Sequence, residues 1–498
     1  MTRAEAQAIY RAGEEAVVRA LLAMDARIEA LTAALEQQGR DFAARLEVSE
    51  QRIKQLEDQL AKNSRNSGKP PSSDGFHRPA PQSLREKSAR PTGGQPGHPG
   101  STLDLVATPD RIEIHPAPDI CAECGAPLAD QPVISFTRRQ VHDLPSKRML
   151  VTDHRAEAKT CTCGCLNPAP FPPGVTAPVQ YGPGVKAAAV YLKHFQLLPY
   201  ERASELLADL FGCRISEGTL ANILQECGDL LEAPVTQLKA LIAGAPVAHF
   251  DETGSRVDQD LWWVHVAATA HATVYDISPK RGTAAMDAMG ILPRFTGRAI
   301  HDHWKPYFRY GCAHGLCNAH HLRELTFVHE QHHQAWAQAM IACLLDMKAG
   351  VAAAKPHRDD LTHFQVRTFR RRYQAIIEEG YRHNPLAPPA KGKTRGRAKQ
   401  TQPRNLLERL DQHRGQVQAF MTDFKVPFSN NLAERDIRMI KVQQKVSGPF
   451  RSEHGAKTFC RIRSYLSTAR KNALGILDAL QRVFAGSPFV PTPVADTS

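Results

Sequence analysis

The sequence lacks any run of 18 or more apolar residues, the length at which a stretch becomes a candidate membrane-spanning helix, so we expect no such helix. It also lacks an apolar segment behind its N-terminus, because Met1–Glu5 leads directly into charged residues, which predicts that there is no signal peptide. Without an export signal, the 11 cysteines are expected to be reduced thiols or metal ligands and not disulfides. These absences together predict a cytoplasmic protein with no membrane partner.

The composition is that of an ordinary globular protein with an excess of positive charge. Hydrophobic residues make up 42% and charged residues 23% of the chain, values that exclude wholesale disorder. The 498 residues suffice for about three domains. A formal net charge of +12 favours a polyanionic partner, which makes nucleic acid the first candidate.

Residues 1–62 have the apolar pattern of a coiled coil. A first seven-residue series is followed by a second one whose phase is shifted by four residues, a stutter that locally unwinds a supercoil without ending it. The first series is Leu21, Ile28, Leu35 and Phe42, with Met24 and Leu31 between them, and the second is Leu46, Ile53 and Leu60. Because no breaker interrupts about forty residues, we predict a homo-oligomer. A lone amphipathic helix packed on its own domain is the alternative.

Residues 63–105 are expected to be a basic, Pro/Gly-rich linker, which could follow a phosphate backbone or serve only as a solvated tether.

Two cysteine clusters then predict a zinc module over residues 106–175, since paired cysteines on tight turns supply zinc with two thiolates at a time. A glycine after the second cysteine of a pair lets the backbone turn around the metal. The nominated ligands of one structural Zn²⁺ are Cys121, Cys124, Cys161 and Cys163, with Cys165 as a substitute for Cys163 and free loop cysteines as the alternative.

Residues 180–235 have helical periodicity and suit either a helix-turn-helix that binds DNA or an ordinary helical hairpin. Gly212 can end a first helix, and Ser216 can cap a second one.

The first part of an α/β core is then expected over residues 243–330. Its predicted elements are a strand at 246–250 followed at once by Asp251, a hairpin of strands at 261–268 and 272–277, and a strand at 297–300 that delivers Asp302.

The last part of the chain is expected to be a helical insertion over 331–425, a final core helix within 426–475 and a tail over 476–498. The insertion contains a basic loop without an acid, whose cations are Lys391, Lys393, Arg395, Arg397, Lys399 and Arg404. Ser429–Asn431 should cap the final helix, on which one face carries Glu434, Arg438, Lys441 and Lys445. Two strand-end aspartates and a helical glutamate are typical of an RNase H-like nucleotidyl transferase, which uses two Mg²⁺ ions.

The chain resembles, over nearly its whole length, the insertion-sequence-66 family of bacterial DDE transposases. The resemblance rests on motifs in a particular order, namely 62–71, 93–100, the cysteine pairs, 251–253, 301–304, 317–325 and 430–435. It implies a leucine-zipper-like coiled coil at the N-terminus, a zinc module and an RNase H-like α/β catalytic core. Together with the helical DNA-binding region considered above, the expected fold class is a multidomain α+β protein. It further implies that Asp251, Asp302 and Glu434 are the catalytic acids and Mg²⁺ ligands.

The same resemblance implies double-stranded DNA as partner, both the element ends and the target, in a bacterial, nucleoid-associated setting and with helper proteins as possible partners. The expected DNA contacts are Arg435, Arg438, Lys441, Lys445, His320 and Arg323. A cluster of six histidines could form a histidine metal site; they are His314, His320, His321, His329, His332 and His333. The preferred interpretation is that His320 and His321 belong to the motif 317–325 and that most of the others are surface or DNA-facing residues. A non-enzymatic, dimeric, zinc-containing DNA-binding regulator is the rival to a transposase.

Overall fold

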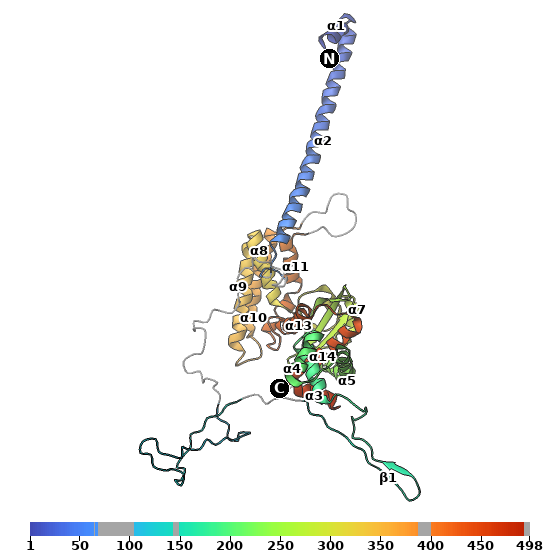
Figure 1. Cartoon of the computed structure of the whole chain (residues 1–498). Coiled ribbons are helices and arrows are strands. Elements are labelled where there is room, and N and C mark those ends of the chain that lie inside the picture. Colours follow the sequence, from blue (N-terminus) through green and yellow to red (C-terminus); the bar gives the residue numbers. More distant parts are fainter. Residues whose placement is uncertain (64, 68–103, 143–148, 387–399, 493–498) are drawn as a thin grey trace.

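Figure 1 shows a computed structural model of the chain, which has a helical rod at one end, two extended arms at the other and a folded α+β body between them. The structure describes residues 1–492 except 64, 68–103, 143–148 and 387–399. Most of the expected linker, including the 93–100 motif, and the basic loop up to Lys399 therefore lie outside the described residues.

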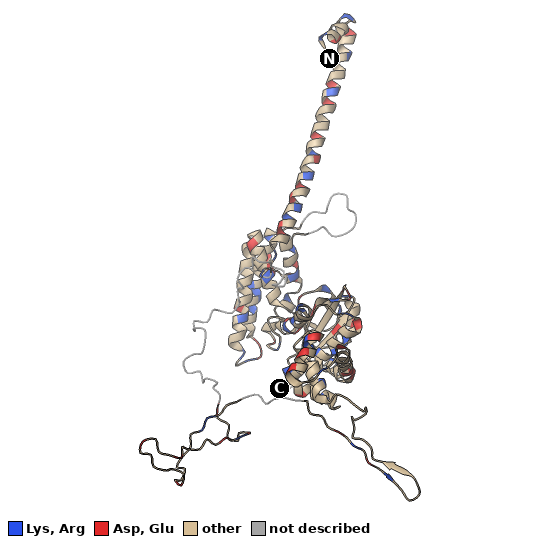
Figure 2. Ribbon diagram, in the orientation of Figure 1, with Lys and Arg blue, Asp and Glu red and all other residues tan. Residues whose placement is uncertain are grey.

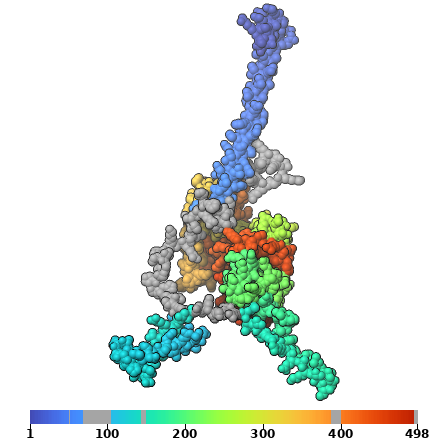
Figure 3. All heavy atoms as spheres, viewed as in Figure 1, coloured from blue at the N-terminus to red at the C-terminus, as the bar shows by residue number. Residues whose placement is uncertain are grey.

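The rod is one long helix whose apolar series are exposed. A short helix, α1 (Arg3–Arg11), precedes α2 (Glu14–Leu60), whose 47 residues extend for about 70 Å. Figure 3 shows α2 projecting away from the rest of the molecule, and Figure 2 shows charges of both signs along it. Leu35 is 68% and Phe42 69% exposed, so the predicted apolar positions have no partner from this copy of the described chain. The predicted helix is confirmed, whereas its self-association remains a proposal.

The two cysteine clusters lie on the two arms. Residues 104–142 contain an isolated bridge between Ile120 and Pro127 but no described helix, and the second arm carries the hairpin β1 (Ala158–Thr160) and β2 (Leu166–Pro168). Figure 1 shows the arms extending in different directions.

A helical unit follows the second arm. Its elements are α3 (Pro183–Val190), the π-helix η2 (Tyr191–Phe195), α4 (Tyr200–Phe211), α5 (Glu217–Leu230) and α6 (Glu232–Ala243). The predicted turn signals are confirmed, because Gly212 adopts a φ of +65° at the end of α4 and the Ser216 hydroxyl accepts from the Thr219 N–H at the start of α5. α3 to α5 share a hydrophobic core with the later helices α14 and α15.

The body contains a five-stranded mixed sheet in the order β5-β4-β3-β6-β7, in which β4 is antiparallel to β3 and β5, and β6 and β7 continue parallel to β3. The strands are β3 (Val247–Val257), β4 (Asp260–Ala268), β5 (Thr273–Ser278), β6 (Arg298–His301) and β7 (Ala313–Leu316). The predicted hairpin is confirmed. The predicted end of the first strand at residue 250 is wrong, because β4 pairs with β3 as far as Val257.

Helices cover both faces of the sheet. One face presents Phe250 to α6, α7 (Thr283–Met289) and the 3-10 helices η3 (Leu292–Arg294) and η4 (Lys305–Arg309). The opposite face, with Val257 and Val264, packs against α13 and α14. Since strand side chains alternate, each residue of β3 is committed to one of these two layers.

The expected insertion is helical, as predicted, and shares a core with β6 and β7 through Ile300 and Leu316. Together with the preceding helix, its elements are α8 (Asn318–His332), α9 (Ala335–Ala354), α10 (His363–His383), α11 (Gln402–Gln412), α12 (Arg414–Val417) and η5 (Ala419–Met421). The expectation that the chain has no candidate membrane-spanning helix needs correction, because α9 is long and apolar enough to cross a membrane, judged by length and composition only. In the fold, Trp336, Met340 and Leu344 of α9 are buried in the shared core, as in a core helix.

The C-terminal part contains three helices where one was predicted. They are α13 (Asn431–Ser447), α14 (Glu453–Lys471) and α15 (Ile476–Phe484). Gly448, with a φ of +74°, follows α13 and allows the chain to turn before α14. Residues 435–471 contain ten Lys and Arg residues. Arg463 is buried and Lys471 pairs at 2.8 Å with Asp436, so these two are not part of an exposed basic surface.

Candidate functional site

Asp251 and Asp302 lie on neighbouring parallel strands. The register of β3 and β6 pairs Val247 with Arg298 and His249 with Ile300, so residue 251 lies at the level of residue 302, just past the end of β6. Adjacent strands are about 4.8 Å apart, which puts these two acids side by side. The prediction that Asp302 follows a strand end is confirmed, whereas Asp251 lies within β3 and not behind it.

Glu434 reaches the same region from the first turn of α13. Asp251 shares the face of β3 on which Val257 packs against Ala433 and Ile437 of α13. The start of α13 is fixed to β3 by Asn430, whose Nδ2 donates to the carbonyl of Phe250 at 2.8 Å. The expected cap is therefore different: Asn430 is the N-cap residue, but its side chain crosses to the sheet and forms no capping bond.

The charges of the three acids influence one another. The pKa of Asp251 lies well above its usual range, first because the carboxyl group is buried and then because Glu252, Asp302 and Glu434 place negative charge nearby. Carboxylate oxygens are the ligands that Mg²⁺ prefers, and a divalent cation would compensate this accumulated charge. The chemistry of the donor set thus fits Mg²⁺.

Glu252 is a fourth acid at this site, and it is assigned no role in the sequence prediction. It points to the opposite face of β3, where the Tyr307 hydroxyl donates to its Oε2 at 2.6 Å and Arg281 donates to its Oε1. Arg281 in turn lies between the rings of Trp263 and Trp304, at 4.8 and 4.2 Å. Because Tyr307 and Arg281 already bind both carboxylate oxygens, Glu252 stabilises β3 next to Asp251 and is not expected to bind a metal ion.

Three side chains surround Glu434. The Cys317 thiol donates to Oε1 over 3.7 Å, His320 Nδ1 lies 3.6 Å from the same oxygen, and Arg323 lies 3.7 Å from Oε2. Burial and the charge of Glu434 raise the pKa of Cys317 to about 12. Within the part of the chain that the structure describes, Cys317, His320 and Glu434 form the group with the spacing of metal ligands. The sequence prediction missed Cys317, although it lies in the motif 317–325.

A buried histidine network flanks Asp302. Its hydrogen bonds connect His301 to His314 at 3.1 Å, His303 to His321 at 3.2 Å and His321 to Asn318 at 3.0 Å. Burial lowers the pKa of His303 to about 2 and that of His321 to about 3, which keeps both rings neutral. His321, which belongs to the motif 317–325, is thus a buried residue, whereas His329 and His333 are exposed. Apart from His320, none of the six predicted histidines belongs to a described group with metal-ligand spacing.

The exposed face of α13 is basic, as the sequence predicts. Arg435, Arg438, Lys441 and Lys445 are all exposed. Lys441 leans onto β3, where its ammonium group donates to the carbonyl of Gly254, and partial burial lowers its pKa. This face begins next to Glu434 and could hold phosphates beside the acids.

The predicted zinc ligands form two separate turns. The N–H of Gly125 donates to the Cys121 carbonyl at 3.0 Å and that of Gly164 to the Cys161 carbonyl at 2.8 Å, and both glycines have positive φ, as predicted. Hydrogen bonds from neighbouring cysteines lower the pKa of Cys121 and Cys163. The two pairs lie on different arms, and the described residues do not join all four thiols in one cluster.

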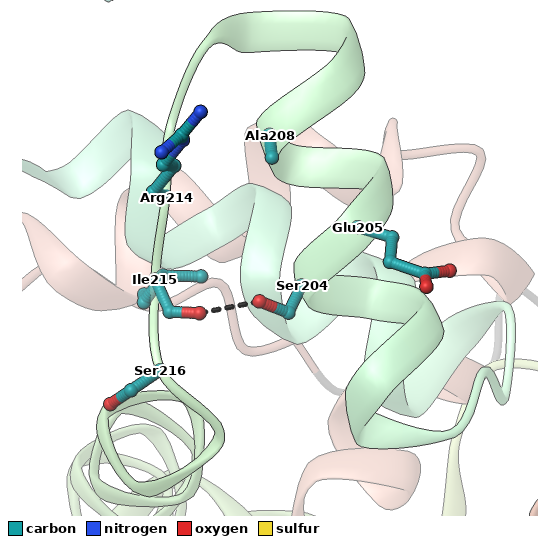
Figure 4. A pocket seen from close by; sticks show the side chains of 6 residues that line it. All are labelled: Ser204, Glu205, Ala208, Arg214, Ile215 and Ser216. Atoms are coloured by element: carbon teal, nitrogen blue, oxygen red, sulfur yellow. Dashed lines mark hydrogen bonds between the residues drawn. The ribbon is translucent and has the colours of Figure 1, made fainter.

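A shallow cavity of about 450 Å³ lies between α4 and the segment that leads into α5 (Figure 4). Its lining residues are Ser204, Glu205, Ala208, Arg214, Ile215 and Ser216. The Ser204 hydroxyl donates to the carbonyl of Ile215 and closes one wall.

The charge of α5 bears on the expected helix-turn-helix. This helix contains Glu217, Glu226 and Asp229 but no Lys or Arg, a charge distribution that does not favour insertion into a DNA groove.

Comparisons with known proteins divide the chain into two matched parts. The family model of a family of unknown function (DUF6444) matches residues 6–104, which include the long helix and most of the basic linker. A search of curated proteins gives no match. The model of the Transposase IS66 family matches residues 178–458, more than half of the chain and the whole span from α3 to the first part of α14. The chain therefore belongs to the IS66 family of transposases.

Proposed function

We propose that this transposase binds the terminal inverted repeats of an insertion sequence and catalyses DNA strand cleavage and strand transfer at Asp251, Asp302 and Glu434. The observation that carries the proposal is the register of β3 and β6, which sets Asp251 beside Asp302 on the face covered by α13. The strand order supports an RNase H-like core, a fold with a five-stranded sheet whose second strand is antiparallel to the rest.

The three acids would act through the metal ions that they bind. Two Mg²⁺ ions held by them would neutralise charge on the attacking and leaving oxygens of an in-line displacement. Asp251, Asp302 and Glu434 would together hold these ions, and Asp251 has the charges of both other acids nearby. Water would be the first nucleophile and the released 3′-hydroxyl the second. No serine, cysteine or tyrosine nucleophile is needed, so we expect no covalent protein–DNA intermediate.

DNA would lie along the exposed face of α13. Arg435, Arg438 and Lys445 point away from the sheet, and Arg323 approaches the same region from α8. Phosphate contacts of this kind fix the position of a duplex and carry no sequence information. Residues outside α13 would therefore recognise the base sequence of the element ends. The acidic residues of α5 do not support a helix-turn-helix as the element that recognises it.

The N-terminal region would bring two copies together. The exposed apolar series of α2 support a coiled-coil oligomer, and the turns at Cys121–Cys124 and Cys161–Cys163 support one structural Zn²⁺ that joins the two arms. The oligomer would assemble the two ends of one element in a single complex, and the Zn²⁺ would stabilise the arms of each copy. The family membership agrees with a cytoplasmic protein that acts on DNA.

The test is a nicking assay on DNA that carries the flanks of the protein's own locus. The wild-type chain should nick this DNA only with a divalent metal, and Asp251→Asn should abolish nicking while the protein still binds. Asp260→Asn is a matched control, because it makes the same change at the exposed start of β4. A metal-independent activity, or DNA binding without any nicking as expected of a regulator, would contradict the proposal.

A further inference from the structure

The surroundings of Glu434 differ from those of an all-oxygen magnesium site. Its Oε1 lies 3.7 Å from the sulfur of Cys317 and 3.6 Å from Nδ1 of His320. With zinc–sulfur bonds of about 2.3 Å and zinc–nitrogen or zinc–oxygen bonds of about 2.0 Å, neighbouring ligands of a tetrahedral site are about 3.3–3.5 Å apart. The two distances to Oε1 exceed this spacing by only a few tenths of an ångström, and all three ligand atoms lie within 4.8 Å of one another.

From this geometry we propose that Cys317, His320 and Glu434 form a binding site for a zinc-class divalent ion, which competes with Mg²⁺ for the carboxylate of Glu434. The inference rests on the proposed function only in assigning Glu434 to the Mg²⁺ site. Sulfur and imidazole ligands select zinc, cobalt and related ions over Mg²⁺, which takes oxygen ligands. Three protein ligands would leave a fourth position open to water.

Each of the three side chains has one potential ligand atom close to those of the other two. Nδ1 of His320 is buried and has no hydrogen-bond partner in the described structure. The sulfur of Cys317 accepts a hydrogen bond from the main-chain N–H of Asn430 at 3.1 Å, a contact that stabilises a thiolate. Oε2 of Glu434 faces Arg323, so Oε1 is the oxygen left to bind the ion.

The local fold explains why these groups meet. Cys317 is the N-cap residue of α8 at the end of β7, and His320 lies three residues further on the same side of the first turn. Glu434 occupies the first turn of α13, whose start is held by Asn430. On binding, the S–H bond of Cys317 breaks, a sulfur–metal bond forms and the proton leaves to solvent, so no electron is transferred. His320 thereby becomes an ion ligand as well as a candidate DNA contact.

The experiment is a Co²⁺ titration of the full-length, metal-stripped protein, because a thiolate bound to Co²⁺ gives a charge-transfer absorption. The wild-type spectrum minus that of Cys317→Ala should contain such a band. The cysteine pairs on the arms contribute equally to both spectra and cancel. Cys343→Ala, a buried cysteine of α9 outside any described metal cluster, is the control and should keep the whole wild-type signal. Identical spectra for the wild type and a folded Cys317→Ala would overturn the inference.

Two further variants decide the question if Cys317→Ala does not fold. His320→Ala and Glu434→Gln should each weaken Co²⁺ binding at this site by about tenfold or more, and unchanged affinity in both would overturn the proposal. In the cleavage assay, added Zn²⁺ should slow the Mg²⁺-dependent reaction of the wild type. A cobalt band that depends on Cys317, found in a protein that never nicks DNA, would contradict the proposed function alone. Cleavage without that band would contradict the ion site alone.

Discussion

The side-chain amide of Asn430 donates to the main-chain carbonyl of Phe250 at 2.8 Å and so connects the start of α13 to the middle of β3. Its Oδ1 lies 2.9 Å from Nδ1 of His249, and its side chain is fully buried. Asp251 is the next residue along β3, and Glu434 lies one turn into α13. One amide group thus sets the spacing between two of the candidate catalytic acids.

Asn430→Ala should destabilise the protein by about 1–3 kcal/mol, since it leaves a buried carbonyl and a buried imidazole nitrogen without partners. It should also reduce cleavage more than DNA binding, because Glu434 would no longer be held opposite Asp251. Chemical denaturation and the nicking assay measure the two effects. Asn431→Ala changes the exposed neighbour and should leave the stability unchanged. Equal stability and cleavage for Asn430→Ala and wild type would refute this role.

The exposed apolar series of α2 predict that the full chain self-associates through this helix. Leu35→Asp puts a charge into the apolar seam and should shift the sedimentation coefficient toward the monomer, while Leu35→Pro should also break the helix. Ala33→Asp adds the same charge on the opposite side of the helix and should leave the oligomer intact. An oligomeric state that is unaffected by Leu35→Asp would exclude a coiled coil as its origin.

The paired cysteine turns predict one zinc ion in the region 106–175. Cys121→Ser should remove this ion and unfold the arms locally, since the free energy of metal binding in such modules is largely free energy of folding. Metal analysis of the purified protein, compared with Cys213→Ser as a control with a buried cysteine far from both turns, measures the loss. Zinc content that is equal in wild type and Cys121→Ser would rule these ligands out.

Features that depend on local chemistry could be predicted from the sequence. The break at Gly212, the cap at Ser216 and the strands of the hairpin each rest on residues a few positions apart. The exposed basic face of α13 follows from helical spacing alone.

Features that depend on distant partners could not be predicted. β3 continues beyond Asp251 because β4 pairs with it, and only this register determines that Asp251 faces α13 while Glu252 faces Tyr307. Likewise, Asn430 has the sequence signature of a helix cap, yet its side-chain amide donates a hydrogen bond to a carbonyl of the sheet, 180 residues away along the chain. The site at Cys317 required both the end of β7 and the start of α13, which no local pattern connects.

The buried ring of His194 predicts that acid destabilises the helical unit. Burial lowers its pKa to about 3, so between about pH 6.5 and about pH 3 the unfolded chain binds a proton that the folded protein does not. Stability therefore falls as the pH decreases, by about 1.4 kcal/mol for this residue at pH 5.5 relative to pH 7.5. His194→Gln should lose less stability over this interval in chemical denaturation. An equal loss in both proteins would show that His194 is not the origin.

The most direct test of the catalytic assignment is the Mg²⁺-dependent cleavage rate of Glu434→Gln, measured together with its affinity for DNA. The substitution keeps the size of the side chain but removes the charge that a metal ion needs. Cleavage should fall by about a hundredfold or more, while DNA binding is retained or becomes tighter. Lys441→Ala should instead weaken binding and its salt dependence more than the chemical step. Glu453→Gln, the same change in the first turn of α14, should behave as wild type. Cleavage by Glu434→Gln at the wild-type rate would contradict the proposal that Glu434 is the third catalytic acid.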